Sequence, residues 1–322
     1  MVKPEKQVRV ECYEARHKAC WDEFVRQSKN GVFLFYRDYM EYHADRFSDC
    51  SLLFFQDDQL IAAMPANQVD ETVVSHGGLT FGGIVSDSKM TTTRMLRVFS
   101  ALLDNLRARG IKKLIYKAIP HMYHLLPSEE DLYALFAHNA RLFRRDVSST
   151  VVAGRRAPLA RNRRKVSNRV KAHGLKVERS QDFSQFMAIA EASLQSRHGS
   201  RPVHTASEIQ LLASRFPENI KLFAMDREGE MLGGVIIYES GLVAHGQYRH
   251  ATEEGMKLGV LDSILDVLVN EVYLDKPFLD FGTSMLDDGS TLNADLIRNK
   301  ESFGARATLY DSYELDLGAQ HL

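Results

Sequence analysis

The sequence predicts a protein of the α/β class, in its α+β form, made of two similar domains. The chain has 322 residues, more than one hydrophobic core usually serves, so size alone favours two domains of roughly 150 residues each. The same order of elements, a hairpin, a glycine loop, an amphipathic helix and an apolar strand, occurs once in each half. We therefore expect domains at 1–150 and 151–322, each with a mixed, mostly antiparallel sheet flanked by helices, and a cleft between them.

Two predicted elements define the first half. Leu52–Phe55 and Leu60–Met64 are apolar runs on either side of a polar turn at 56–59, which predicts a hairpin. A glycine-rich stretch, 75–83, follows. The run Thr91–Gly110 has apolar residues at helical spacing, threonines that can cap its start and a glycine that can end it, so it predicts a helix.

The second half repeats this order with one more strand. Ile220–Met225 and Leu232–Tyr238 flank a turn at 226–229, and a third strand is expected at Leu242–Tyr248. A glycine-bearing loop at 253–258 then leads into a helix that opens at Gly259. The apolar stripe of this helix is expected at Leu261, Ile264, Leu265, Leu268 and Val272. The strand that follows the helix is expected at Phe278–Phe281.

The composition is that of an ordinary soluble protein. Hydrophobic residues make up 44% and charged residues 26%, and no apolar run approaches the ~20 residues that a membrane helix needs. The first residues show neither the apolar core nor the cleavage site of a secretory signal. Cys12, Cys20 and Cys50 are an odd set without Cys-x-x-Cys spacing, which indicates reduced thiols rather than a disulfide or zinc framework. We expect a cytoplasmic protein that holds no metal.

A basic segment near the middle of the chain contrasts with the formal net charge of −1. Arginines and lysines crowd the run from Arg155 to Lys171. Two interpretations stay open: a solvated helix that links the domains, or a cationic surface for a nucleotide diphosphate or RNA. No Phe, Tyr or Trp lies within the segment, although aromatic side chains that stack on bases are typical of proteins that bind single strands. We therefore expect no nucleic-acid partner.

In each half a strand runs through a glycine-bearing loop into a helix. The start of such a helix leaves backbone N–H groups unpaired, and its dipole favours an anion. The loop can therefore hold a pyrophosphate, or it can be a tight turn that needs glycine only for its backbone conformation. Neither loop has the Gly-x-x-x-x-Gly-Lys-Ser/Thr pattern of nucleoside triphosphatases or the Gly-x-Gly-x-x-Gly pattern of dinucleotide-binding folds, so these classes are disfavoured.

The element order and four segments of the second half resemble a known family. The segments are Leu194–Thr205, His245–Tyr248, Asp280–Ser284 and Lys300–Arg306. They resemble tandem GNAT proteins of the Fem-type branch, in particular bacterial ones associated with the biosynthesis of surface polysaccharides such as the O-antigen of lipopolysaccharide. The resemblance covers nearly the whole chain. It implies a cytoplasmic N-acyltransferase that moves an acyl group from acyl-CoA to the amine of a nucleotide-linked amino sugar, with a dTDP-sugar suspected.

The resemblance also implies where coenzyme A binds. The family's loop, Arg/Gln-x-x-Gly-x-Gly/Ala, falls on 254–259, where Gly255 and Gly259 match it. Glu254 departs from the pattern, and Lys257 replaces a glycine but can supply a charge to the phosphates. The corresponding stretch of the first half, 86–90, lacks the glycines. The second domain is therefore expected to bind acyl-CoA, and the first is expected to hold the acceptor.

Direct attack by an amine needs a base and donors for the developing oxyanion, but no enzyme nucleophile. No cysteine falls in a second-half motif and no Gly-x-Ser-x-Gly elbow is present, which disfavours an acyl-enzyme. The resemblance implies that the backbone around Gln247 and Tyr248 is the oxyanion side and part of the acyl-CoA site, because members of the superfamily commonly use a strand carbonyl or N–H beside the thioester. For the base we expect His204 ahead of His198, because imidazole titrates near neutral pH and both lie in a polar segment; either can also be an ordinary solvated histidine.

The remaining expected site residues are charged or flanked by glycine. Asp280, a further catalytic candidate, lies in an apolar strand where its charge needs a partner, and Lys300 or Arg249 is expected to supply one. Lys300 is also expected to bind a phosphate or carboxylate of the cofactor. The expected acceptor contacts are His76, Gly77, Gly78, Arg201 and Ser284. Ordinary structural roles, such as a surface charge or a glycine turn, stay open for these residues.

Two other functions stay open. A Fem-type transferase would take an aminoacyl group from aminoacyl-tRNA to a peptidoglycan precursor. It would present an extensive basic surface and often a coiled-coil insertion, and no inserted heptad pattern is visible. The other alternative is a non-catalytic binding protein that kept the fold. The sequence specifies neither the acyl chain, nor the sugar, nor the oligomeric state.

Overall fold

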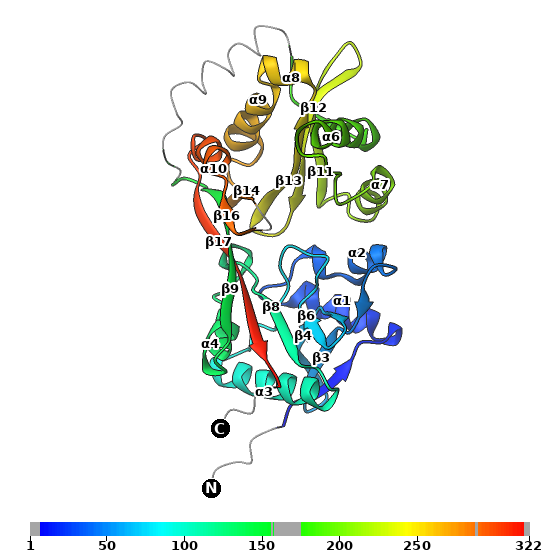
Figure 1. Ribbon diagram of the computed structural model, residues 1–322, viewed down its shortest axis with the longest axis vertical. Coiled ribbons are helices and arrows are strands. Elements are labelled where there is room, and N and C mark those ends of the chain that lie inside the picture. The colour runs from blue at the N-terminus through cyan, green and yellow to red at the C-terminus, as the bar shows by residue number, and fades with distance from the viewer. Residues whose placement is uncertain (1–6, 156, 158–174, 287–288, 319–322) are drawn as a thin grey trace. The chain divides into compact units, whose positions relative to one another are not determined.

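The computed structural model describes residues 7–155, 157, 175–286 and 289–318, and the chain divides into two compact units (Figure 1). The first unit comprises 1–146 with 309–322, and the second comprises 147–308. Strands β9 (Arg141–Val152) and β17 (Arg306–Asp316) each pass from one unit into the other. The sequence predicts a single boundary, at residue 150. In the structure the chain leaves the first unit after residue 146 and returns to it at residue 309.

Two further predictions from the sequence concern the basic segment and membrane-spanning helices. Most of the basic segment between Arg155 and Lys171 falls outside the described residues. Within the described ranges, no helix is long and apolar enough to cross a membrane.

The second unit contains one mixed sheet. Its strands lie in the order β10, β11, β12, β13, β14, β9, and all neighbours are antiparallel except β13 and β14, which run parallel. The strands other than β9 are β10 (Glu178–Ser180), β11 (Ile220–Arg227), β12 (Glu230–Glu239), β13 (Val243–Ala251), β14 (Phe278–Thr283) and the separate pair β15 (Met285–Leu286) and β16 (Thr291–Leu292). The helices are α6 (Phe183–His198), α7 (Ala206–Arg215), α8 (Glu253–Leu258), α9 (Val260–Val267), η5 (Leu268–Val272) and α10 (Ala294–Glu301).

Helices cover both faces of this sheet (Figure 1). α6 packs on β12 and β13, and α9 packs on the other face of the same strands. The face under α9 is the hydrophobic core, where Val235 and Ile237 of β12 and Phe281 of β14 lie in one buried cluster with Val260 and Ile264. The apolar stripe of α9 and the alternating apolar residues of the strands therefore bury each other.

The elements predicted in the second half are confirmed with one exception. The segment 253–258, expected as a loop, is the helix α8, so that expectation is wrong. Thr252 caps this helix and two glutamates occupy its first turn, an arrangement that favours a helix start. Gly259 has a φ of 85° and separates α8 from α9, which explains why the predicted helix begins there. The last turn of that helix, η5, is a π-helix.

The first unit has two sheets. One has the order β1, β3, β4, β7, and the other has the order β17, β8, β6, β5, β2, in which β6 and β8 run parallel. The strands other than β9 and β17 are β1 (Arg9–Cys12), β2 (Ser48–Asp49), β3 (Leu52–Gln56), β4 (Gln59–Met64), β5 (Asn67–Val69), β6 (Thr72–Val74), β7 (Val85–Ser86) and β8 (Lys113–Lys117). The helices are η1 (Ala15–His17), α1 (Lys18–Gln27), η2 (Phe33–Phe35), α2 (Arg37–Met40), η3 (Glu41–His43), α3 (Thr92–Ala108), η4 (His121–Tyr123) and α4 (Glu130–Ala137).

The hairpin and the helix predicted in the first half are confirmed. β3 and β4 turn at Asp57 and Asp58, whose φ angles of 49° and 58° are those that a tight two-residue hairpin needs. α3 follows Thr91, whose side chain accepts a hydrogen bond from the N–H of Arg94. The buried face of α3 consists of Met95, Val98, Phe99, Leu102, Leu103 and Leu106.

A buried polar pair joins β8 to α4 in this unit. The hydroxyl of Tyr116 donates to Oδ2 of Asp131 at 2.6 Å and accepts a hydrogen bond from the N–H of Ile84 at 2.7 Å. Burial raises the pKa of Asp131 from 3.8 to about 6, and the hydrogen bonds from Tyr116 and from the backbone only partly offset it. The folded state therefore holds the proton of Asp131 more tightly than the unfolded chain does.

This raised pKa predicts a pH dependence of stability. The contribution of Asp131 is fully present below its unfolded pKa of 3.8 and is lost as the pH rises through about 6, which corresponds to up to about 3 kcal/mol. Asp131→Asn has no such titration. In urea unfolding, the stability of the wild type minus that of the variant is expected to fall between pH 4 and 6 and then to level off. A difference that stays constant across this range would contradict the assignment.

Candidate active site

The parallel strands β13 and β14 of the second unit separate in the middle of the sheet. The two strands pair only at Val243 with Phe278, Ala244 with Leu279 and His245 with Asp280. Beyond this point β13 continues to Ala251 and β14 to Thr283. We call the place where pairing ends, at His245 and Asp280, the fork. Backbone groups beyond a fork are no longer engaged by the neighbouring strand, so a ligand can use them.

A β-bulge in β13 lies directly beyond the fork. The register along β12 shifts there, because Ile237 pairs with Gly246 and Ile236 pairs with Tyr248. Gln247 therefore has no partner residue in β12. In a regular strand, positions 245 and 248 point to opposite faces, and the extra residue brings His245 and Tyr248 to the same face.

β14 is irregular at the same level. Asp280 pairs with Thr150 of β9 and Thr283 pairs with Ser148, so Phe281 and Gly282 together face a single residue. Gly282 has a φ of 76°, and a Cβ at this position would lie 3.5 Å from the ring of His245. The left-handed backbone favours a glycine here, whereas the distance to the ring would be an ordinary van der Waals contact.

Asp280 is fully buried and accepts hydrogen bonds from three side chains. Its Oδ1 accepts from the hydroxyls of Ser148 at 2.6 Å and Thr150 at 2.9 Å, and its Oδ2 lies 2.7 Å from Nδ1 of His245. Burial alone raises the pKa of Asp280, but the bond and charge of His245 and the two hydroxyls outweigh it, so the pKa is lowered. The carboxylate stays charged at neutral pH.

The tautomer of His245 follows from this contact. A carboxylate can only accept hydrogen bonds, so Nδ1 must carry the proton, and Nε2 of the neutral ring keeps a lone pair. The side chain of His245 is 15% exposed, so it stands at the edge of the core rather than within it. An imidazole held in this way by a buried carboxylate has the geometry of a general base.

The contacts of Asp280 correct the sequence analysis. Lys300 and Arg249 were the expected partners, but the ion pair is made with His245. Sequence analysis did not select His245 as a site residue. The signal was available, because two parallel strands at 242–248 and 278–281 can bring His245 level with Asp280, but the pairing register was not known.

A second pair that contains a histidine joins His204 to Tyr248 of β13. Nδ1 of His204 lies 2.6 Å from the hydroxyl of Tyr248, and His204 itself is buried. Thr205 and Glu208 form a capping box at the start of α7, which fixes the backbone next to His204, as the sequence predicts. Burial raises the pKa of Tyr248 to about 12, so its hydroxyl stays protonated. Tyr248 thus links the expected base, His204, to the strand that carries His245.

Lys300 of α10 is buried at the end of β14. Its Nζ donates to the carbonyl oxygens of Gly282 at 2.6 Å and Thr283 at 2.7 Å. Burial lowers the pKa of Lys300 to about 7, the charge of Arg249 lowers it further, and Asp280 opposes the shift. Lys300 therefore loses its charge more readily than an exposed lysine does.

The other expected residues of the second unit have separate positions. The guanidinium of Arg201 lies 3.4 Å from Glu191 and its side chain is 80% exposed, so it is a surface ion pair. Ser284 is buried, and its hydroxyl makes no hydrogen bond with the described residues. His198 is the last residue of α6, but its side chain lies outside the described part of the structure.

The expected phosphate-binding loop is the helix α8. Gly255 is buried against β12, where a Cβ would collide with the carbonyl oxygen of Leu232. Gly259 ends the helix in the left-handed conformation, and Lys257 lies in its last turn. Both glycines that match the family's loop therefore have packing or backbone roles.

The first unit has no equivalent fork among its described strands. β7 and β8, which follow the same chain order as β13 and β14, belong to different sheets. The segment 75–83 lies beside β8 instead: Ser75 donates its N–H to Ile115, Gly82 donates its N–H to Lys117, and the N–H of Lys117 bonds the hydroxyl of Ser75. The chain itself therefore uses the backbone groups that a ligand would need.

Three of the expected acceptor residues, His76, Gly77 and Gly78, lie in this segment. His76 is buried with a φ of 62°, and its Nδ1 makes no hydrogen bond within the described part of the chain. Burial lowers the pKa of His76 to about 3, so the ring is neutral. Gly77 donates its N–H to Asn67, and Gly78 packs so closely on His43 that a side chain would collide with it.

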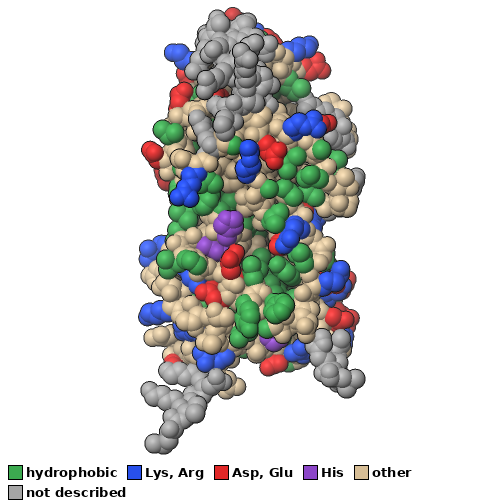
Figure 2. All heavy atoms as spheres, turned by 90° about the vertical axis from the view of Figure 1, so that its left-hand side faces the viewer, with side chains coloured by type: hydrophobic (Ala, Val, Ile, Leu, Met, Phe, Trp, Pro, Cys, Tyr) green, Lys and Arg blue, Asp and Glu red, His purple; other side chains and the backbone are tan. Residues whose placement is uncertain are grey.

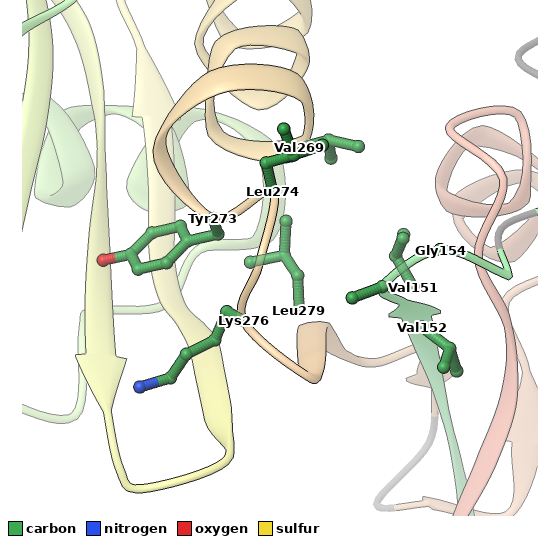
Figure 3. A pocket seen from close by; sticks show the side chains of 9 residues that line it. Val151, Val152, Gly154, Val269, Tyr273, Leu274, Lys276 and Leu279 are labelled. Carbon is green, nitrogen blue, oxygen red and sulfur yellow. The ribbon is translucent and has the colours of Figure 1, made fainter.

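An apolar pocket of about 220 Å³ lies at the other end of β14 (Figure 3). It is lined by Val151, Val152, Ala153, Gly154, Val269, Tyr273, Leu274, Lys276 and Leu279. The polar ends of Tyr273 and Lys276 both bond Glu239, so neither is free to orient a ligand. The described residues also contain no group of three or more His, Cys, Asp or Glu side chains that could hold a metal. The fork is therefore the candidate site.

Lys300→Met tests the buried cation. The wild type must neutralise Lys300 or bury its charge on folding, so its stability relative to the variant is expected to rise with pH by about 1.4 kcal/mol per unit above pH 7. This follows because the folded pKa of about 7 lies below the unfolded value of 10.5. Denaturant unfolding at several pH values between 7 and 9 measures the slope. A relative stability that does not change with pH would show that Lys300 keeps an ordinary pKa.

Comparisons with known proteins give a family match in the second unit. Residues 153–284 match the family described as acetyltransferase (GNAT) domain. No curated protein sequence matches the chain significantly. This matched region contains His204, His245 and Asp280.

Similar folds occur among solved structures. FemX gives a TM-score of 0.66 at 10% identity, over 94% of this chain and 96% of that chain. L-PGS from Bacillus licheniformis gives 0.62 at 12% identity, over 97% and 94%. A tandem GNAT protein from the clavulanic acid biosynthesis pathway gives 0.52 at 8% identity, over 98% and 100%. Residues 153–284 therefore match a GNAT domain, and the fold of the chain is similar to that of a tandem GNAT protein.

Proposed function

We propose that this protein is an N-acyltransferase whose second unit moves an acyl group from a thioester such as acyl-CoA to the amine of a nucleotide-linked amino sugar. The observation that carries the proposal is the His245–Asp280 pair at the fork of a GNAT-type domain. An acyl transfer to an amine needs a base, and this pair supplies one. The amino-sugar acceptor rests on the resemblance of the segments that contain His204, His245, Asp280 and Lys300.

In this mechanism His245 prepares the acceptor. An amino sugar arrives mostly as an ammonium ion, which cannot attack a carbonyl carbon. Nε2 of His245 accepts its proton, and the buried carboxylate of Asp280 stabilises the imidazolium that forms. The neutral amine then attacks the thioester carbonyl, and the carbon–sulfur bond breaks as the amide forms. The departing thiolate takes a proton from Tyr248, and the second proton that the nitrogen loses restores the Tyr248 hydroxyl.

The fork also offers groups that stabilise the developing negative charge. The backbone N–H of Gln247 in the bulge is our candidate for the oxyanion donor, because bulges next to active sites re-aim backbone groups. Lys300 adds positive potential from the end of β14. The hydroxyl of Tyr248 stays protonated, so it can return a proton to the departing thiolate, with His204 bonded behind it.

The two units then have different roles. The second unit has a fork that can receive the reactive end of the donor. The first unit fills the corresponding position with its own segment 75–83, which supports the proposal that it binds no acyl-CoA and holds the acceptor instead.

A second candidate function is the transfer of an aminoacyl group. One structure of similar fold is named a putative lysylphosphatidylglycerol synthetase, with a TM-score of 0.60 and 11% identity. On the face shown in Figure 2, however, Lys and Arg side chains are interspersed with Asp and Glu side chains among the described residues. This face therefore shows no extended basic surface of the kind that binds an RNA carrier. We favour the thioester because residues 153–284 match an acetyltransferase domain.

The proposal is tested by an assay of thiol release. Acetyl-CoA and a panel of nucleotide-linked amino sugars are incubated with the full chain, and free thiol is measured with the acylated sugar as second product. Release that requires an amino sugar supports the proposal. A chain that transfers only aminoacyl groups from aminoacyl-tRNA would establish the second candidate instead.

The assignment of the base is tested by comparing two histidines. His245→Gln is expected to lower kcat by about 100-fold or more and to change the acid limb of the pH–rate profile, because it removes the general base. His204→Ala is expected to lower kcat by only about tenfold, because His204 acts through Tyr248. His250→Gln, on the same strand and away from Asp280, is the matched control. A large loss in His204→Ala with near-normal turnover in His245→Gln would transfer the role of base to His204.

A further inference from the structure

At the start of α8, where the family resemblance places the pyrophosphate of coenzyme A, the chain itself already uses two backbone donors. The N–H of Gly255 bonds the hydroxyl of Thr252 at 3.0 Å, and the N–H of Met256 bonds the carbonyl oxygen of Thr252 at 2.9 Å. At the other end, the N–H of Gly259 bonds the carbonyl oxygen of Gly255 at 3.0 Å. A pyrophosphate would have to displace bonds that the chain already makes.

The charges at this position also oppose an anion. Glu253 and Glu254 occupy the first turn of α8, and Glu254 forms an ion pair with Arg227 of β11. Carboxylates at a helix start already interact with the positive end of its dipole. Each further negative charge at about 4 Å from them costs about 1 kcal/mol in water and about 4 kcal/mol at an effective dielectric constant of 20.

The two glycines that match the family's loop are required for reasons other than a phosphate. Gly255 is required because a Cβ would collide with the backbone of Leu232. Gly259 is required because its φ is 85°. The match to the family's loop is therefore accounted for by packing and backbone conformation, with no phosphate needed to explain it.

We infer that this protein recognises its acyl donor without a pyrophosphate site at α8, and that Glu254, held by Arg227, excludes one there. The acyl group and the atoms next to it, at the fork, then carry the recognition. The donor class is an activated acyl group whose recognised part ends before any pyrophosphate, so acyl-pantetheine serves as well as acyl-CoA. This inference rests on the proposed function for its kinetic test only.

The kinetic test compares S-acetylpantetheine with acetyl-CoA as donors for the full chain. The values of kcat/KM are expected to agree within about threefold, because a pyrophosphate that has no site at α8 gains no contact there that lowers the barrier. A preference for acetyl-CoA of about 100-fold or more would overturn the inference. Arg227→Ala, which leaves the carboxylate of Glu254 in place, is expected to keep this ratio. Glu254→Gln removes that charge and is expected to raise the preference for acetyl-CoA, so an unchanged ratio would contradict the excluding role of Glu254. If neither thioester is turned over, the proposed donor is wrong, and the binding test below decides the inference.

The binding test needs no activity. Amide hydrogen exchange of the full chain is followed by mass spectrometry with and without coenzyme A or inorganic pyrophosphate. The exchange rates of the peptide that contains 253–259 are expected to be the same in all three samples. Protection of this peptide by either ligand, lost when the ligand is removed, would overturn the inference whatever the kinetic result.

Discussion

The buried carboxylate of Asp280 is the interaction on which the arrangement of the second unit's site depends. A charge in the core of a sheet is costly unless donors surround it, and here the donors come from both strands that flank β14: Ser148 and Thr150 from β9, and His245 from β13. The carboxylate therefore ties three strands together at the level where β13 and β14 part. It also orients His245, since Nδ1 must donate to it. The contact between Asp280 and His245 therefore both joins the strands and orients the proposed base.

The bulge at Gln247 adds the second constraint. Without the extra residue, Tyr248 would point to the core face, away from His245. With it, two histidine-containing pairs, His245 with Asp280 and His204 with Tyr248, lie along one face of one strand.

The two units show how a repeated element order can diverge. In the second unit β13 and β14 part beyond His245 and Asp280, whereas in the first unit the segment 75–83 forms hydrogen bonds with β8.

The sequence predicts the fold well and the site only in part. Hairpins, strands and long helices follow from local patterns of polarity, so the elements at Leu52–Met64, Thr91–Gly110 and Phe278–Phe281 could be placed from sequence. The helix α8 could not, because its glycines resembled a ligand loop. His245 was missed for a different reason. Its role depends on the register of two parallel strands 35 positions apart in the sequence, and on a bulge, and neither is written in local composition. Asp280 was selected because a charge within an apolar strand is visible in the sequence itself, but its partner was not.

The central claim is that Asp280 fixes the tautomer of His245, so that in the neutral ring Nδ1 carries the proton and the lone pair of Nε2 is available. Long-range proton–nitrogen NMR on the full chain with ¹⁵N-labelled histidine, assigned with the His245→Gln variant, observes this tautomer directly. The account predicts that in the neutral ring Nδ1 is protonated and Nε2 is not, and that Asp280→Asn disturbs this preference. A His245 ring with its proton on Nε2, or one that exchanges freely between both tautomers in the wild type, would contradict it.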